Sequence, residues 1–169
     1  MNYGTCENCP FYRQKNLASR PLTIKTPLYL RNGKNDPKDL IIFKYPGICE
    51  AMEGRAVVSS KKKGCMTERL KDSWLKFGKT EEDFDITYFI KCYKGENNRK
   101  IPKSAIALCS QKLRNELKKK KYERIFVIGK EFYSYLKKIF EEEKIDSEII
   151  YIFNLSTIKI NELDDLWTK

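Results

Sequence analysis

Four short apolar runs, spaced along the chain and separated by helical patterns, constrain the fold more than any other feature. These runs are LIIF (40–43), ITYFIK (86–91), RIFVIG (124–129) and EIIYIF (148–153). Each run is nearly continuous in apolar residues, which is typical of strands that are buried on both faces of a sheet. The sequence therefore predicts four buried strands.

Between the runs lie three segments, 67–77, 103–119 and 130–143, whose apolar residues recur at intervals of three and four. This spacing predicts helices with one apolar stripe. Strands that alternate with helices favour right-handed crossovers and a sheet covered on both faces. We expect an α/β fold, a three-layer αβα sandwich around a central, mostly parallel four-stranded sheet.

The rest of the chain suggests a single domain over residues 1–169, a length sufficient for a hydrophobic core. The first 39 residues look irregular and carry a turn signal, RNGKNDP (31–37). The chain has no 18-residue apolar run, so we expect no membrane span. The first ten residues lack the pattern of a signal peptide, so we expect a cytoplasmic protein.

The charge is strongly positive, with 34 Lys and Arg against 23 Asp and Glu and a formal net charge of +11. Such an excess favours a polyanionic partner, most often nucleic acid. The alternative is a basic, well-solvated surface without a partner. The run KKKK (118–121) is most simply the solvated end of a helix, where cations suit the helix dipole.

Histidine is absent, which excludes histidine-based acid–base chemistry and histidine metal ligands. Six cysteines in a reducing compartment favour metal binding or catalysis over disulfides. Four of them have the spacing C-x2-C … C-x16-C: Cys6, Cys9, Cys92 and Cys109. A zinc ribbon usually closes with a second short pair, whereas dispersed cysteines also suit a cubane cluster. By spacing alone a cluster, zinc and no metal all stay open, and Cys49 and Cys65 are read as buried cysteines.

Several short motifs follow one another in a particular order. CENCPF (6–11) is followed by Pro46-Gly47, six further residues and Gly54-Arg55, then by YFIKC (88–92), Asn97-Asn98-Arg99, Cys109 and Gly129. In order and near-matching spacing, these motifs resemble those of the iron–sulfur uracil-DNA glycosylases, families 4 and 5. The resemblance runs from residue 6 to about residue 160. It implies a parallel αβα sandwich and a 4Fe–4S cluster on Cys6, Cys9, Cys92 and Cys109.

The chain departs from this family at the positions that match its active site. Lys44 stands where the resemblance implies a carboxylate that positions the attacking water, and Val57 where it implies a phenylalanine that stacks on uracil. Tyr88 replaces an asparagine that reads the base edge, and would fill the pocket. Asn154 replaces a histidine that stabilises the departing base. Since these changes occur together, we expect a scaffold that has lost base excision.

Contacts to DNA are still expected where the resemblance places the nucleic acid. The candidate residues are polar or cationic and follow strand ends: Arg55, Ser59, Ser60, Lys61, Lys62, Lys63, Asn98, Arg99 and Ser156. Hydroxyls and ammonium groups can hold phosphates of single- or double-stranded DNA with little sequence preference. The alternative for the three consecutive lysines is a solvated loop.

The first functional hypothesis is a catalytically degenerate, cluster-bearing protein that binds DNA or docks onto a polymerase or another replication or repair protein. Its divergence would suit a phage or mobile element, which would place it in the host cytoplasm. The second is an active glycosylase for uracil or another modified base, with Asn154 and Asp85 or Glu50 in new roles. The third is a protein-binding inhibitor or assembly module whose contact patch would be the aromatics of EFYSYLKKIF (131–140). The favoured reading of Tyr133 and Tyr135 is instead that they are half-buried helix residues.

Overall fold

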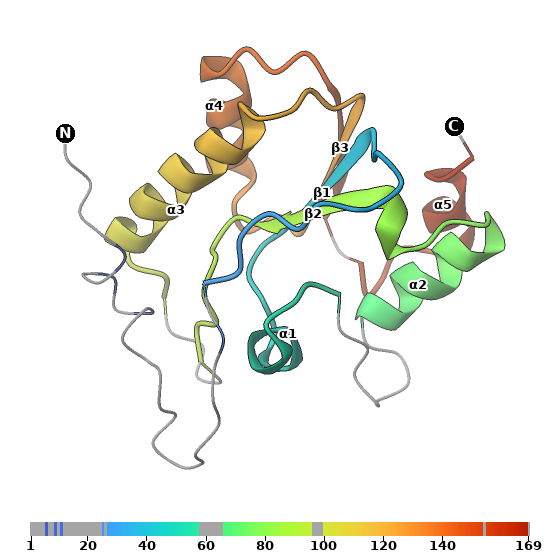
Figure 1. The fold of residues 1–169 in the computed structure, drawn as a ribbon, viewed down its shortest axis with the longest axis horizontal. Coiled ribbons are helices and arrows are strands. Elements are labelled where there is room, and N and C mark those ends of the chain that lie inside the picture. Colours follow the sequence, from blue (N-terminus) through green and yellow to red (C-terminus); the bar gives the residue numbers. More distant parts are fainter. Residues whose placement is uncertain are drawn as a thin grey trace.

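A four-stranded, wholly parallel sheet forms the centre of the protein (Figure 1). The computed structural model describes residues 6, 9, 11, 25, 27–57, 66–95, 100–153 and 155–168. The strand order is β2-β1-β3-β4. The bounds are Asp39–Phe43 for β1, Phe84–Tyr88 for β2, Arg124–Ile128 for β3 and Glu148–Ile152 for β4. All four predicted strands are therefore confirmed.

The register of the sheet brings the carboxyl ends of the strands together. Phe43, the last residue of β1, lies opposite Tyr88 of β2 and Ile128 of β3. The second strand differs from its predicted range of 86–91, because β2 begins at Phe84 and ends at Tyr88. Beyond that point the backbone N–H of Phe89 still donates to the carbonyl of Phe43 at 2.7 Å. Neighbouring strands thus end at one common edge, here called the carboxyl edge.

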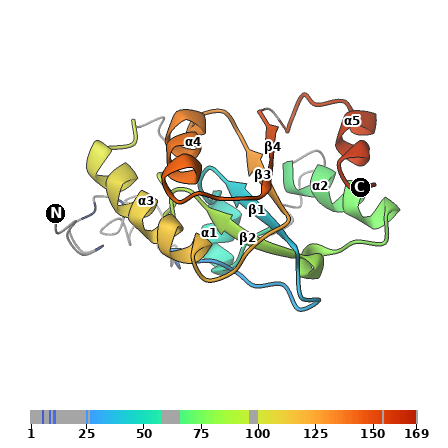
Figure 2. The same ribbon diagram turned by 90° about the horizontal axis from the view of Figure 1, so that it is seen from above.

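Helices cover both faces of the sheet, as Figure 2 shows, with α3 and α4 on one side and α2 and α5 on the other. The bounds are Ile48–Glu53 for α1, Met66–Lys76 for α2, Lys103–Leu117 for α3, Tyr133–Glu142 for α4 and Ile160–Asp165 for α5. A 3-10 turn, η2, covers Glu81–Asp83. The three predicted helices are confirmed. The two six-residue helices were not predicted, because such short segments hold too few turns to display a period.

Alternation along the strands builds two separate cores. In β1, Leu40 and Ile42 pack towards α3 and α4, whereas Ile41 packs towards the opposite layer. In that second layer Trp74 of α2 stacks on Phe84 with ring centroids 4.7 Å apart. Burial on both faces explains why the strand sequences are nearly continuous in apolar residues, and it confirms the predicted αβα class.

The segment 27–31 covers the free edge of β2. The backbones of Arg31 and Ile86 exchange two hydrogen bonds of 2.9 Å, and the N–H of Leu28 donates to the carbonyl of Lys91 at 2.7 Å. This pairing protects an edge strand from other chains, in a region that the sequence had left irregular. No helix in the described ranges is long and apolar enough to cross a membrane.

Candidate functional site at the carboxyl edge

Lys44 directly follows β1 and lies where β1 and β3 end. Its side chain runs along Gly129, because a Cβ at that glycine would lie 3.5 Å from Lys44 Cδ. The ammonium group is 4.0 Å from the carboxylate of Glu131 and 4.9 Å from the ring centroid of Tyr45. The position where the resemblance implies an acid therefore holds a cation that already has a counterion.

Tyr88 ends β2 beside it and points into the core. Only 3% of its surface is exposed, and its ring lies 5.7 Å from that of Phe43. Burial raises the pKa of the Tyr88 phenol well above its ordinary value, the nearby carboxylate of Glu50 raises it further, and a hydrogen bond with the Val57 backbone opposes the rise. The phenol thus stays neutral.

Val57 packs in the same buried cluster as Tyr88. Its φ angle of 57° lies in the left-handed region, which is costly for a β-branched residue. The side chain is 1% exposed. Neither Val57 nor Tyr88 therefore presents a side chain to a ligand; both fill the interior.

The two alternative acids lie in different places. Glu50 in α1 lies below the turn that follows β1, since a Cβ at Gly47 would be 2.6 Å from one of its carboxylate oxygens. Asp85 is the second residue of β2, at the opposite end of the strand, and is fully buried. It accepts hydrogen bonds of 2.9 Å from the Gly33 N–H and the Tyr122 hydroxyl. Only Glu50 is thus near the carboxyl edge.

Of the predicted DNA contacts, the structure describes Arg55 and Ser156. Arg55 pairs with Glu81 of η2 at 3.7 Å, and its side chain remains 56% exposed. Ser156 is exposed in the turn after β4. The residues that lie outside the described part are Ser59, Ser60, Lys61, Lys62, Lys63, Asn98, Arg99 and, among the catalytic positions, Asn154.

Arg69 of α2 holds the turn that follows β4. Its guanidinium donates to the carbonyl oxygens of Leu155 and Ile158, both at 2.6 Å. No sequence signal predicts this contact, because Arg69 lies off the apolar stripe of its helix and its acceptors are 86 and 89 residues away. Arg69 therefore positions the turn that carries Ser156.

The cysteines gather at one end of the core. Cys9, Cys92 and Cys109 are buried in one apolar cluster, and the Cys9 N–H donates to the carbonyl of Cys6 at 2.9 Å. Burial raises the pKa of the Cys109 thiol, the Lys91 backbone N–H and ammonium oppose the rise, and Cys9 and Cys6 add to it. The described cysteines form no disulfide. Within the described ranges no three Cys, Asp or Glu side chains are arranged to hold a metal ion.

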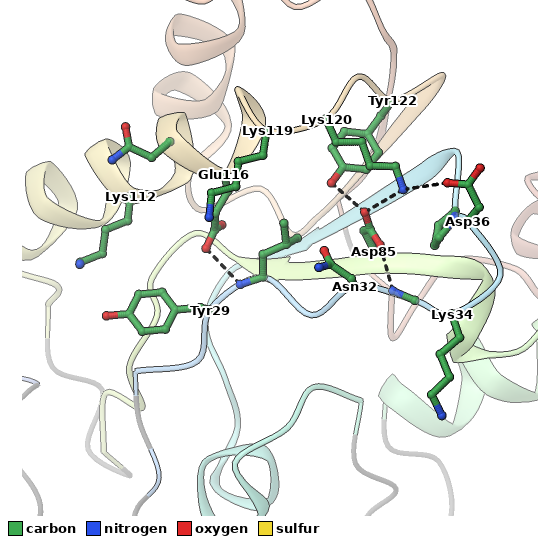
Figure 3. Close-up of a pocket in the computed structure, with 14 residues that line it drawn as sticks. Tyr29, Asn32, Lys34, Asp36, Asp85, Lys112, Glu116, Lys119, Lys120 and Tyr122 are labelled. Carbon is green, nitrogen blue, oxygen red and sulfur yellow. Dashed lines mark hydrogen bonds and ion pairs between the residues drawn. The ribbon is translucent and has the colours of Figure 1, made fainter.

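A cavity of about 850 Å³ lies beside β2 and α3, away from the carboxyl edge. Figure 3 shows Lys112 and Tyr29 on one side of it, and Lys120, Tyr122 and Asp85 together on the other. The two buried carboxylates that line it both have partners. Asp85 accepts the two hydrogen bonds described above, and Glu116 accepts one from the Leu30 N–H at 3.1 Å and pairs with Lys91. Both acids are thus engaged in contacts within the fold.

Comparison with known families gives one match. The model of the Uracil DNA glycosylase superfamily matches residues 30–164, which include all four strands and Cys92 and Cys109. Cys6 and Cys9 precede the matched range. No curated protein matches the chain.

Proposed function

Because this chain belongs to the uracil-DNA glycosylase superfamily, we propose that it is a DNA-binding accessory protein of replication or repair that no longer excises bases. Members of the superfamily act on DNA, and the net charge of +11 suits a polyanion. A polymerase or another protein of the replication or repair machinery is the partner that we propose. An origin in a phage or mobile element fits the divergence from the family pattern.

The burial of Tyr88 is the observation that carries the proposal. A glycosylase must hold the extruded base in a pocket by stacking and by hydrogen bonds to its edge. At the two matching positions this chain has a phenol and a valine, both packed inside the core. The ammonium of Lys44 would in addition repel the positive charge that develops on the sugar.

We also propose a 4Fe–4S cluster on Cys6, Cys9, Cys92 and Cys109. The donor set fits, since thiolates are the ligands of such clusters and three of these thiols share one apolar cluster. When bound, the cluster would supply iron–thiolate bonds that cross-link the N-terminal segment to the sheet and α3. The residues of the chain would exclude water around it.

The test combines two assays on protein purified without oxygen. One measures abasic sites in oligonucleotides that carry uracil, hypoxanthine or 5-hydroxymethyluracil; the other measures DNA binding by gel shift at low and high salt. We expect no abasic sites, and binding that weakens steeply with salt. Excision at any base contradicts the loss of catalysis, and absence of binding at low salt contradicts the DNA-binding role.

The position of Glu50 favours one second candidate, a glycosylase with a rearranged site. It is a carboxylate at the carboxyl edge, beside the turn at Gly47, where a general base could act. If excision is detected, Glu50→Gln should abolish it. A matched Glu53→Gln change in the same helix should leave it intact.

A further inference from the structure

Three aromatic rings form an open cluster at the carboxyl end of β4. The rings of Tyr151 and Phe153 are nearly parallel, at 15°, with centroids 5.9 Å apart. Tyr133, at the start of α4, meets both edge-on, with centroids at 4.7 Å from Tyr151 and 5.7 Å from Phe153. We call Tyr133, Tyr151 and Phe153 the aromatic platform.

The platform is exposed where other large rings are buried. Phe153 is 51% exposed and Tyr133 is 37% exposed. By contrast, Phe126 in β3 is 0% exposed and Phe132, just before α4, is 4% exposed. Tyr151 and Phe153 are two residues apart and so face the same side of the sheet. β4 is an edge strand, so no further described strand pairs beside it. A contiguous cluster of exposed rings is a candidate interaction surface.

Cations flank the platform in the chain, one in the turn before α4 and one within α4. Lys130 and Lys137 are both exposed, and they lie three residues before and four residues after Tyr133. The Tyr133 N–H donates to the Lys130 carbonyl at 3.2 Å, so the two residues are one turn apart. Lys137 has one distant counterion, Glu141 at 3.9 Å. Aromatic rings combined with nearby cations can hold the bases and the phosphates of one strand.

The platform also adjoins the carboxyl edge. The N–H of Gly129, the residue against which Lys44 packs, donates to the carbonyl of Ile152 at 2.8 Å, one residue before Phe153. Ligands of open parallel sheets collect at this edge. A nucleic acid that reaches the carboxyl edge therefore comes within reach of these rings.

We propose that the aromatic platform stacks unpaired bases of a DNA strand whose phosphates contact Lys130 and Lys137, so that the protein prefers single-stranded DNA. This inference rests on the proposed DNA-binding function and adds the binding surface and the strand form. Bases in a duplex are stacked on each other and cannot reach the rings, whereas unpaired bases offer both faces.

The experiment measures fluorescence anisotropy of a short labelled oligothymidine and of a duplex of equal length, over about 50 to 200 mM salt. The wild-type protein should bind the single strand more tightly. Phe153→Ala and Tyr133→Ala should each weaken single-strand binding at least about five-fold, because one stacked base is lost. The slope of affinity against salt should stay the same, since no phosphate contact is removed.

Two matched variants separate stacking from other effects. Tyr135→Ala removes a tyrosine of α4 that is 42% exposed but lies outside the platform, and should leave binding unchanged. Lys130→Gln should instead lower the salt slope by about 0.7, the loss of one phosphate contact. Circular dichroism and thermal melting of each variant show whether it is folded.

Three outcomes overturn the inference in distinguishable ways. If the wild-type protein binds single strands and the folded platform variants bind them equally well, the platform does not stack bases, while the DNA-binding function stands. If these variants lose duplex and single-strand binding equally, the rings do not read unpaired bases. If the wild-type protein binds neither DNA, the proposed function itself fails.

Discussion

The ammonium group of Lys91 and the carboxylate of Glu116 form an ion pair inside the protein, between the end of β2 and α3. Their side chains are 1% and 8% exposed. Glu116 also accepts hydrogen bonds from the Thr87 hydroxyl at 2.8 Å and from the Leu30 N–H at 3.1 Å. Burial lowers the pKa of Lys91, and Glu116 opposes that change. The pair thus joins the N-terminal segment, β2 and α3 next to Cys92.

Removal of one partner should be much worse than removal of both. Glu116→Gln leaves the Lys91 ammonium buried without a counterion, and we expect the free energy of unfolding to fall by about 3–5 kcal/mol. In Lys91→Met/Glu116→Gln no buried charge remains. The amide oxygen can still accept from the Leu30 N–H, and the amide NH2 can donate to the Thr87 hydroxyl oxygen. Urea denaturation should find the double variant more stable than Glu116→Gln. If the two substitutions lower the free energy of unfolding additively, Lys91 and Glu116 are not coupled.

Replacement of Tyr88 should test its role as a core residue. Tyr88→Asn introduces the amide that the resemblance implies at this position, yet it removes a buried ring and should cost about 3–5 kcal/mol of stability. Tyr88→Phe, the control, loses only the hydroxyl contact and should cost about 1 kcal/mol. We expect no excision activity from Tyr88→Asn, because Lys44 and Val57 remain. Denaturation and the abasic-site assay measure the two effects, and gain of activity would show that Tyr88 alone blocks the site.

The cluster assignment predicts that iron depends on particular cysteines. Cys92→Ser should remove the brown colour and the bound iron from protein prepared without oxygen, and should lower the melting temperature. Cys49→Ser, a half-buried cysteine of α1 outside the proposed ligand set, should retain both. Iron and sulfide analysis with visible absorption measures the outcome. A colourless wild-type protein that contains zinc, or no metal, would refute the cluster.

Asp164 should make stability depend on pH in the acid range. The hydrogen bond from Lys76, and then that from Ser73, hold the pKa of the Asp164 carboxyl below its ordinary value of 3.8. The stability that it contributes is therefore complete above about pH 3.8 and is lost as the pH falls through the lower pKa of the folded state. The difference in unfolding free energy between the wild type and Asp164→Asn should be constant near pH 6 and should decrease below about pH 4.

Urea denaturation across this pH range measures the difference in unfolding free energy. The control is Asp165→Asn, at the exposed neighbouring residue. Its stability should follow that of the wild type at each pH. If the difference in unfolding free energy stays unchanged down to the lowest pH measured, the contacts of Asp164 with Ser73 and Lys76 do not favour the charged carboxylate.

Strands and longer helices could be predicted because their signals are local. The runs that became β1, β3 and β4 are nearly continuous in apolar residues, and α3 repeats its apolar stripe over its whole length. The helices α1 and α5 escaped prediction because six residues display no period. Residues 27–31 escaped because their pairing with β2 depends on a partner about 55 positions away, at Ile86. The match of the superfamily to residues 30–164 agrees with the order of motifs.

The sequence by itself determined the αβα class, through apolar runs that alternate with helical periods, and the chemical character of the site, through the residues at the positions of Lys44, Val57 and Tyr88. Only the tertiary structure decided which partners these side chains have. Lys44 meets Glu131, Arg69 holds the turn at Leu155, and Arg55 pairs with Glu81. Such contacts join residues far apart in the chain, and they depend on the register and order of the strands, which no local pattern encodes.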